Sequence, residues 1–501
     1  MNLGIGTWPA RRAAVRPLDV CIEFESAATT YADFATRVNR LANALTDAGV
    51  RHGDRVAVVS FNHPAVLETF FASGLIGAIC VLVNPRLRTP EIEYILRDSA
   101  PSVVVHGGQL VGVAAELAPR LEVREWLSVD EPGVGRPFEE FLRSGAPEMP
   151  MVDVQQDDVA LIMYTSGTTG NPKGAMLTHG NLFYQYVNAL IGQDLRQDEV
   201  HLAVAPLFHI AGLNMMTLPT FTLGGRIIIH RGFQAEAVLA EIARSRVTST
   251  FMVPSMLDLL SQSPEFAASD LSSLRAVMVG GSPLPERTIR TYLARNIPTM
   301  QGFGMTEASP GITMLEPRDS LDKLGSAGRV HFFAEYRLVD LNGDDVEPGE
   351  TGEILARGPA VMKGYWSNPS ATERALEGGW YHSGDIGSCD EDGYLYIRDR
   401  LKDMYISGGE NVYPAEIENA LLNLPGVRDA AVIGVPDEKW GETGRAFVVP
   451  TPDAPGVDEI RAQLKTRIAG YKMPRDIVII DELPRTATGK VRKHDLRTLT
   501  V

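Results

Sequence analysis

The sequence Tyr164-Thr165-Ser166-Gly167-Thr168-Thr169-Gly170-Asn171-Pro172-Lys173-Gly174 decides how the rest of the chain is interpreted. It follows an apolar run at 159–163 that predicts a buried β-strand. Glycines let backbone N–H groups turn toward an anion, hydroxyls add donors, and a lysine adds a mobile positive charge. The stretch therefore predicts a phosphate-binding loop, although a surface loop rich in turn formers has a similar composition. The Walker spacing is absent, which argues against the phosphate loop of kinases and GTPases.

Five later segments extend this interpretation over most of the chain. They are Gly-Phe-Gly-Met-Thr-Glu at 302–307, Tyr-His-Ser-Gly-Asp at 381–385, Asp-Arg-Leu-Lys-Asp at 399–403, Ser-Gly-Gly-Glu-Asn-Val-Tyr-Pro at 407–414 and Pro-Arg-Thr-Ala-Thr-Gly-Lys at 484–490. In this order they closely resemble the motifs of the adenylate-forming superfamily, which includes acyl-CoA synthetases, peptide-synthetase adenylation domains and luciferases. Within it, the chain looks most like bacterial fatty-acyl-CoA and feruloyl-CoA synthetases.

The composition is that of an ordinary globular protein large enough for two or more domains. The 501 residues are 44% hydrophobic and 22% charged, and the formal net charge is −16. That charge argues against a general nucleic-acid binder but allows a small nucleotide site. Cys21, Cys80 and Cys389 lack the spacing of metal ligands and are typical of reduced cytoplasmic thiols. We expect no signal peptide and no membrane span, and we leave peripheral membrane association open.

Alternating strands and helices predict an α/β fold. The first run contains helices at 30–49, 64–77 and 90–99 and strands at 55–60, 78–83 and 102–106. The second run contains strands near 202–205, 226–230, 248–253, 276–279 and 299–302. Two such runs predict two helix-covered, mainly parallel sheets packed together. Residues 128–156 are expected to be a surface connection, 325–397 a small β-rich module, and the remainder mixed α+β.

The resemblance also implies a division into domains. It predicts a large N-terminal adenylation domain over 1–399, a hinge at 400–402 and a small, mobile α+β domain over 403–501.

The activity implied by the resemblance is that of an AMP-forming acyl-CoA synthetase. A carboxylic acid attacks the α-phosphate of ATP in the presence of Mg²⁺, which releases pyrophosphate and leaves an acyl adenylate. Coenzyme A then displaces AMP. Because the first step brings two anions together, charge neutralisation should dominate its catalysis.

The resemblance assigns the phosphates and the metal to particular residues. The β- and γ-phosphates are assigned to Thr165, Ser166, Gly167, Thr168, Thr169, Gly170 and Lys173. Thr306 is expected to contact phosphate, and Glu307 is the expected ligand of Mg²⁺, a hard cation that favours carboxylate oxygen. A lone Thr-Glu pair is more often a helix cap, but its place after the 302–305 segment reverses that preference.

The adenosine is expected to contact four segments. Asp385 and Arg400 match the ribose ligands, although an isolated Gly-Asp is more often a turn and such an ion pair often a surface feature. The adenine is assigned to a turn containing Gly281, Ser282 and Pro283 and to the strand residues Gly302, Phe303 and Gly304. Phe303 stands where the family often has tyrosine, so it can stack on adenine without a phenol hydrogen bond.

The remaining assignments concern the carboxylate and the thiol. Lys490 matches the lysine that bridges carboxylate and phosphate oxygens in the first step, a task suited to a point charge on a flexible stem. Lys402 matches the hinge of the domain rotation, and Gly408 and Gly409 match the turn that lines the pantetheine channel. His209 matches a residue that positions the carboxylate, although a lone histidine is more often structural and a basic C-terminal segment is usually only solvated.

The expected acyl site is uncharged. The resemblance places around it Ile210, Ala211, Gly212, Met215, Gly302, Phe303, Met305, Ala308 and Ser309. Synthetases for malonate carry an arginine at the position of Gly302, and cinnamate-specific relatives often have a bulkier side chain near Ala211 and Gly212. The sequence therefore predicts a deep pocket for apolar monocarboxylates, with medium- to long-chain fatty acids first and bulky or aryl-propenoic acids such as ferulate second.

Three other functions were weighed. An adenylating enzyme could load a carrier protein instead of coenzyme A, and a luciferase-like oxygenase is a more distant relative. A nucleotide-binding regulatory protein without catalysis is disfavoured by the joint presence of Glu307, Asp385, Arg400 and Lys490. A homodimer is left open.

Overall fold

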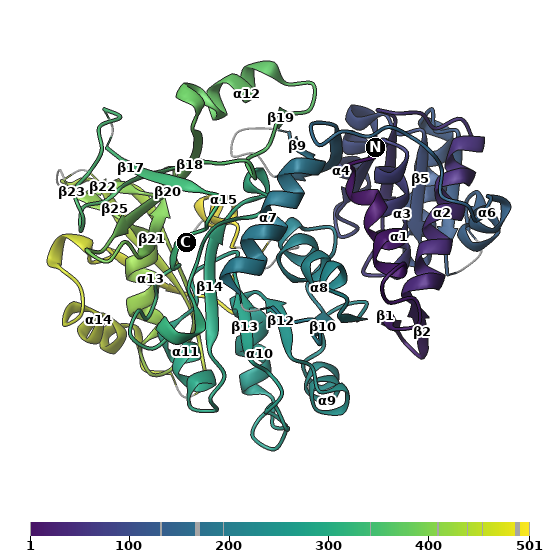
Figure 1. The fold of residues 1–501 in the computed structure, drawn as a ribbon. Helices are drawn as coiled ribbons and strands as arrows, with labels where there is room; N and C mark the ends of the chain where they lie inside the picture. Colours follow the sequence, from purple (N-terminus) through teal and green to yellow (C-terminus); the bar gives the residue numbers. More distant parts are fainter. Residues whose placement is uncertain are drawn as a thin grey trace.

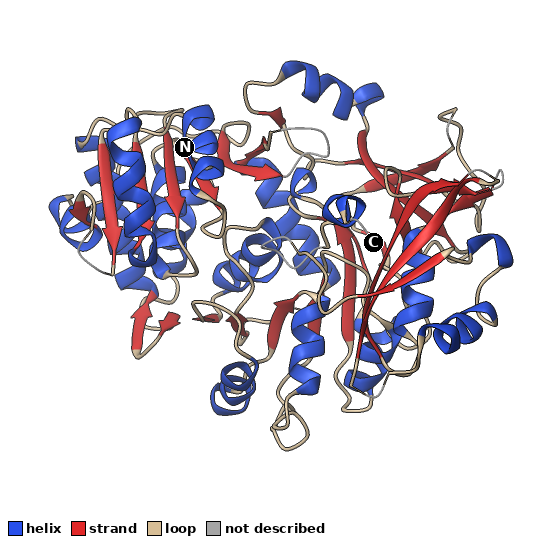
Figure 2. Cartoon of the chain, turned by 180° about the vertical axis from the view of Figure 1, so that it is seen from behind, coloured by secondary structure: helices blue, strands red, loops and turns tan. Residues whose placement is uncertain are grey.

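The computed structural model of this chain describes residues 2–499 apart from 131–132, 166–170, 194, 341, 408–409, 438, 453 and 486–490. Two large sheets form its body, and a small β-module and a C-terminal α+β unit lie together at the opposite end from the N-terminal helices (Figure 1). The cartoon seen from behind shows helices on both sides of these sheets (Figure 2).

The first sheet has the strand order β19-β9-β8-β4-β3-β5-β6-β7. Its strands are β19 (Gly364–Tyr365), β9 (Lys173–Thr178), β8 (Val159–Thr165), β4 (Ile79–Val83), β3 (Arg55–Val59), β5 (Val103–Gly107), β6 (Glu125–Val129) and β7 (Arg136–Pro137). They pair in parallel from β8 to β7, whereas β9 returns antiparallel to β8. Nearly continuous Val and Ile runs suit strands that are covered on both faces.

The second sheet has the order β16-β15-β14-β13-β12-β10-β11-β1-β2. Its strands are β16 (Arg329–Val330), β15 (Gly311–Met314), β14 (Thr299–Gly304), β13 (Ala276–Val279), β12 (Ser249–Met252), β10 (Val200–Ala203), β11 (Arg226–Ile229), β1 (Val20–Phe24) and β2 (Ala27–Thr30). Pairing is parallel from β14 to β1 and antiparallel at both edges. The predicted pair of mainly parallel sheets is confirmed.

Helices bury the faces of both sheets. The outer face of the first is covered by α4 (Thr89–Ser99) and α5 (Val111–Leu117), and that of the second by α9 (Ala235–Ser245), α10 (Pro254–Gln262) and α11 (Glu286–Leu293). One large core joins the inner faces through α1 (Trp8–Ala13), α2 (Tyr31–Asp47), α3 (Pro64–Leu75), α7 (His179–Gly192) and α8 (Leu218–Leu223). This shared core fixes the carboxyl ends of β8 and β14 relative to each other.

The expectation of a surface connection over 128–156 is wrong for its central part. This stretch supplies β7 and the helix α6 (Phe138–Ser144), which packs against α2. Phe138, Phe141 and Leu142 are buried in the shared core. The sequence did not indicate this helix because it is short and follows a Pro- and Gly-rich stretch. Its three apolar residues are too few to predict a buried helix between such polar flanks.

The expected β-rich module and α+β C-terminal domain are both present. The module consists of β17 (Glu335–Val339), β18 (Gly352–Arg357), β20 (Tyr381–Cys389) and β21 (Leu395–Arg400), with α12 (Pro369–Ala375) beside it. The C-terminal unit consists of β22 (Tyr405–Ser407), β23 (Glu410–Val412), β24 (Val427–Asp437), β25 (Gly441–Pro450), β26 (Asp476–Ile479), α13 (Pro414–Leu422), α14 (Val457–Lys465) and α15 (Lys493–Thr498). The boundary at 400–402 and the mobility of this unit stay predictions. In the described part of the chain, no helix combines the length and apolar character needed to span a membrane.

A buried carboxylate joins the module to the C-terminal unit. Asp399, near the end of β21, is 8% exposed, and its side chain accepts hydrogen bonds from the backbone N–H of Ala415 at 2.8 Å and of Arg400 at 2.7 Å. It therefore caps α13 from the neighbouring strand. Lys493 of α15 forms an ion pair with Glu418 of α13 at 2.8 Å. Burial raises the pKa of Asp399 to about 6, although the positive charge of Lys493 opposes the shift.

Replacement of Asp399 by asparagine should change how stability depends on pH. A carboxyl whose pKa is higher in the folded chain than its ordinary 3.8 stabilises the fold when protonated, and this contribution is lost as the pH rises through about 6. Asp399→Asn is neutral throughout, so its Tm should rise relative to that of the unmodified protein between about pH 4 and pH 7. The upper limit is about 3 kcal/mol, from a shift of roughly two pKa units. Parallel curves of Tm against pH would contradict the assignment.

Candidate active site

The two ends of the predicted phosphate loop lie opposite each other. In the antiparallel pairing of β8 and β9, Thr165 is the register partner of Lys173. This pairing brings a hydroxyl and an ammonium group to the same end of the first sheet. The intervening Ser166, Gly167, Thr168, Thr169 and Gly170 lie outside the described residues.

Glu307 is the centre of a hydrogen-bonded cluster at this position. Its carboxylate is 6% exposed, and its Oε1 accepts hydrogen bonds from Thr165 Oγ1 at 3.1 Å and from Tyr365 Oη at 2.9 Å. The residue lies in the short turn Thr306–Ala308, between β14 and β15, and Thr306 beside it is half-buried. A buried carboxylate is tolerated because these donors replace water. The structure thus brings Thr165, Thr306 and Glu307 together.

Tyr365 is a member of the cluster that the sequence did not indicate. It lies in β19, next to β9, and the Nζ of Lys173 sits 5.2 Å from the centre of its ring. Burial and the charge of Glu307 raise the pKa of Tyr365 and of Tyr381, so both phenols stay protonated as donors. The positive Lys173, the phenols and the negative Glu307 make a polar face on which phosphate oxygens and a cation can be neutralised together.

The expected adenine segments lie at the carboxyl ends of β13 and β14. Gly281, Ser282 and Pro283 are exposed, Gly302 is half-buried, and Gly304 is exposed. Phe303 points into the shared core and is 8% exposed. Gln301, which the sequence also did not indicate, ties these segments together. Its Oε1 accepts a hydrogen bond from the N–H of Leu284 at 2.7 Å, while its Nε2 donates to the carbonyls of Gly325 and Ser326.

Asp385 and Arg400 are brought together as expected. They are register partners in β20 and β21, and Arg400 Nε lies 3.5 Å from Asp385 Oδ1. Both side chains are partly exposed, so the pair can be reached by a ligand and contributes little stability on its own. Lys402 follows in the turn after β21 and is exposed.

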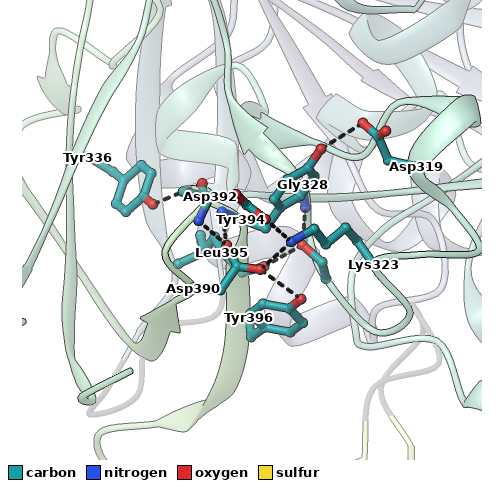
Figure 3. Close-up of polar contacts among 11 residues, drawn as sticks. Asp319, Lys323, Gly328, Tyr336, Asp390, Asp392, Tyr394, Leu395 and Tyr396 are labelled. Carbon is teal, nitrogen blue, oxygen red and sulfur yellow. Dashed lines mark hydrogen bonds and ion pairs between the residues drawn. The ribbon is translucent and has the colours of Figure 1, made fainter. Parts of the chain in front are cut away.

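A charged cluster holds the far end of the same hairpin (Figure 3). The Nζ of Lys323 contacts Asp390 Oδ2 at 2.9 Å and Asp392 Oδ2 at 2.6 Å, and it sits 4.5 Å from the centre of the Tyr394 ring. The two aspartates raise the pKa of Lys323. The segment after Lys323 pairs with β21, since Leu395 exchanges backbone hydrogen bonds with Ala327 and Gly328. This segment also binds Gln301, so β14 and the hairpin that carries Asp385 share one support.

The other predicted residues are dispersed or undescribed. His209 is half-buried after β10, with its ring 4.8 Å from that of Phe208. Gly408 and Gly409 in the β22–β23 hairpin and Lys490 near the C-terminus lie outside the described residues. The labelled strands β22 and β23 lie at the outer end of the molecule, whereas α15 lies nearer its centre (Figure 1).

Of the residues expected around the acyl group, Ile210, Phe303 and Ala308 are buried in the shared core and Met305 packs against it, whereas Met215 and Ala211 belong to a separate apolar cluster. This separate cluster contains Ala205, Met215, Met216, Phe251, Met278, Met300 and Met314, with Ala211 packed against it. A Cβ at Gly302 would lie 2.9 Å from Met314 Cε, so the absence of a side chain lets β14 lie close to this methionine-rich cluster, which is called the methionine wall below. Methionine side chains adapt to irregular shapes, which suits a surface that receives a bulky apolar group.

Comparison with known proteins fits this geometry. The family model for AMP-binding enzymes matches residues 9–366. The chain belongs to the AMP-binding enzyme family. The model for the C-terminal domain of these enzymes matches residues 416–490.

Relatives and solved structures cover nearly the whole chain. A feruloyl-CoA synthase from an Amycolatopsis species is 48% identical, with 99% of both chains covered. A long-chain-fatty-acid–CoA ligase of Mycobacterium tuberculosis is 39% identical, with 98% of both covered. The crystal structure of an anthranilate CoA ligase in complex with anthranoyl-AMP is 28% identical with a TM-score of 0.94, covering 99% of this chain and 97% of the other. This AMP-binding enzyme is an AMP-forming acid–thiol ligase that acts through an acyl adenylate and uses ATP, Mg²⁺ and coenzyme A.

The chemistry of the Glu307 site fits Mg²⁺. This ion prefers oxygen ligands and is usually held by one or two carboxylates together with substrate phosphates and water. Glu307 offers one buried carboxylate beside the phosphate loop, and no cluster of three or more ligating side chains occurs among the described residues. Such a ligand set relies on ATP to complete the coordination.

Replacement of Glu307 by glutamine removes the negative charge of the side chain while keeping its size and shape. The amide oxygen can still accept hydrogen bonds from Thr165 and Tyr365, so Tm should change little. Adenylate formation should fall by at least ~10²-fold because a charge is lost where the metal binds. The Mg²⁺ concentration for half-maximal rate should rise about tenfold.

Glu350 is exposed, so the variant Glu350→Gln is the matched control for the change in net charge. An unaltered Mg²⁺ titration of Glu307→Gln would rule out this residue as a ligand.

Proposed function

We propose that this ligase activates a monocarboxylic acid that carries no second charge, either aryl or alkyl, and transfers it to coenzyme A. The observation that carries this proposal is the methionine-rich cluster beside Gly302, all of whose members are uncharged. A second carboxylate buried against this wall would lack a partner, at a cost of several kcal/mol.

Aryl acids are the first choice within this class. The 48% identity to a feruloyl-CoA synthase exceeds the 39% identity to a long-chain-fatty-acid–CoA ligase, and the anthranilate ligase also takes an aryl acid. The medium- to long-chain preference expected from the sequence stays a prediction. Transfer to a carrier protein is the alternative second step, and release of AMP that depends on free coenzyme A would exclude it.

Each residue of the site then has a task in adenylate formation. Lys173 and the loop after Thr165 hold the β- and γ-phosphates, and Thr306 contacts phosphate beside them. Glu307 holds Mg²⁺, which supplies charge neutralisation at the phosphates. Asp385 accepts hydrogen bonds from the ribose hydroxyls with Arg400 in support, and the turn at Gly281, Ser282 and Pro283 borders the adenine. His209 orients the carboxylate for attack on the α-phosphate.

The second half-reaction uses a different face of the C-terminal domain. Lys490 bridges the carboxylate and the α-phosphate in the first step, and rotation about Lys402 then replaces it by the Gly408–Gly409 turn. Arg287 lies at the interface that this rotation would rearrange, where its guanidinium donates to the carbonyls of Leu422, Val427 and Arg428 at 3.1–3.3 Å. A cytoplasmic location is supported by the three free cysteines and by the need for ATP and coenzyme A.

The two half-reactions should respond differently to loss of Lys490. Lys490→Ala should lower acyl-adenylate formation, measured by pyrophosphate release, by at least ~10²-fold because one strong electrostatic contact is lost. Transfer from supplied acyl adenylate to coenzyme A should change much less. The exposed Lys465→Ala is the matched control. Equal losses in the two steps would contradict the assigned role.

The acid preference should follow apolar contact area. We expect kcat/KM to rise from acetate to laurate, with ferulate among the best substrates and malonate among the worst. Each buried methylene is worth about 0.8 kcal/mol, roughly fourfold in specificity. Acetate or malonate as the best substrate would contradict the proposal.

A further inference from the structure

Four buried polar side chains meet at the edge of the apolar wall. They are Gln185 of α7, Asn214 in the π-helical turn Gly212–Thr217, Ser309 before β15, and His331 after β16, with exposed fractions of 0%, 0%, 0% and 4%. Within the described residues, Gln185 Oε1, Asn214 Oδ1, Ser309 Oγ and His331 Nε2 find no hydrogen-bond partner. A buried polar atom without a partner is costly, and several from different elements in one place call for a ligand.

The geometry places this group against the predicted acyl site. Gln185 Nε2 lies 3.7 Å from Met215 Sδ in the methionine-rich wall. A Cβ at Gly311 would lie 2.7 Å from Gln185 Nε2 and 2.8 Å from His331 Nε2, so both side chains reach the same point on β15. Gly311 is the register partner of Gly304, two residues along β14 from Gly302. Asn214 Nδ2 donates to the carbonyl of Ser309 at 2.8 Å, which ties the polar group to the turn that carries Glu307.

We propose that Gln185 and His331 bind a neutral hydroxyl group on the end of the acid remote from its carboxylate. This rests on the proposed function and narrows its substrate class to hydroxylated acids, of which a phenolic aryl-propenoate is the simplest. Gln185 offers an acceptor in Oε1, and His331 offers a ring nitrogen near the same point on β15, so one hydroxyl can donate to one group and accept from the other. The methionine wall holds the apolar body of the acid.

The chemistry favours a neutral group over a second carboxylate. Burial lowers the pKa of His331 to about 4, so the ring is uncharged at neutral pH, and glutamine, asparagine and serine carry no charge. The four residues can satisfy a hydroxyl fully but cannot neutralise an anion. A site built to hydrogen-bond a hydroxyl discriminates strongly against the analogue without it, because its own groups are then left unpaired.

The test compares substrates that differ only in the hydroxyl. For the full-length protein with ATP, Mg²⁺ and coenzyme A, kcat/KM for 4-hydroxycinnamate should exceed that for cinnamate by at least ~10-fold. In Gln185→Leu this ratio should fall at least ~5-fold, and His331→Phe should act in the same direction. The pair 8-hydroxyoctanoate and octanoate shows whether the same recognition extends to alkyl acids.

Met278→Leu is the matched control, since it changes the same apolar cluster at similar volume, whereas Met215 is itself a contact of Gln185, and it should leave the hydroxyl ratio unchanged. A ratio near one in the unmodified protein, or an equal ratio in Gln185→Leu, would overturn the inference and assign these polar atoms to a buried water instead. The first criterion holds even where a variant fails to fold. Failure to form a coenzyme A thioester with either acid, or with any acid of the alkyl series, would overturn the proposed function itself.

Discussion

The site depends on one buried carboxylate that must be satisfied by donors from two other segments of the chain. Glu307 cannot remain buried without donors, and it takes them from Thr165 at the end of β8 and from Tyr365 in β19. Its own position is set by the turn between β14 and β15. The first sheet, through β8 and its edge strand β19, and the second sheet are therefore held together where the phosphate loop begins. The shared core between the sheets gives this contact its rigidity, because the two strand ends cannot shift independently.

A second set of buried charges lies where the domains meet. Asp399 caps α13, and Lys493 pairs with Glu418 of the same helix, so the start of α15 is held close to the end of β21. Arg497 of α15 is also 3.6 Å from Asp403, just beyond the predicted hinge. The helix that follows Lys490 is thus attached to the segment about which rotation is proposed. A movement at the hinge would carry this helix with it, and that coupling is what the proposed exchange of Lys490 for the Gly408–Gly409 turn requires.

The fold was largely predictable because its signals are local. Buried strands alternating with amphipathic helices identify both sheets, and register then places Asp385 opposite Arg400 and Thr165 opposite Lys173. What the sequence could not supply depends on contacts distant along the chain. Tyr365 belongs to the site only because β19 adds to the edge of the first sheet beside β9, and Gln301 and Lys323 act through backbone carbonyls and aspartates in other segments. Similarly, α6 is stabilised as a helix because three of its apolar residues are buried against α2. The polar residues around it in the sequence give no indication of this contact.

The turn between β14 and β15 connects the proposed metal ligand with the proposed acyl site. Glu307 faces the phosphate loop from one side of the turn, while two residues later the Ser309 carbonyl is bound by Asn214 beside the acyl wall. Because Gly302 and Gly311 carry no side chains, Met314 can lie close to the backbone at the first and Gln185 and His331 close to the backbone at the second. An acid bound against the methionine-rich cluster, as we propose, would contact the same short turn that carries Glu307, the proposed metal ligand. The fit of its remote end is then transmitted over a few residues to the step in which its carboxylate reacts, and remote binding energy can improve catalysis as well as affinity.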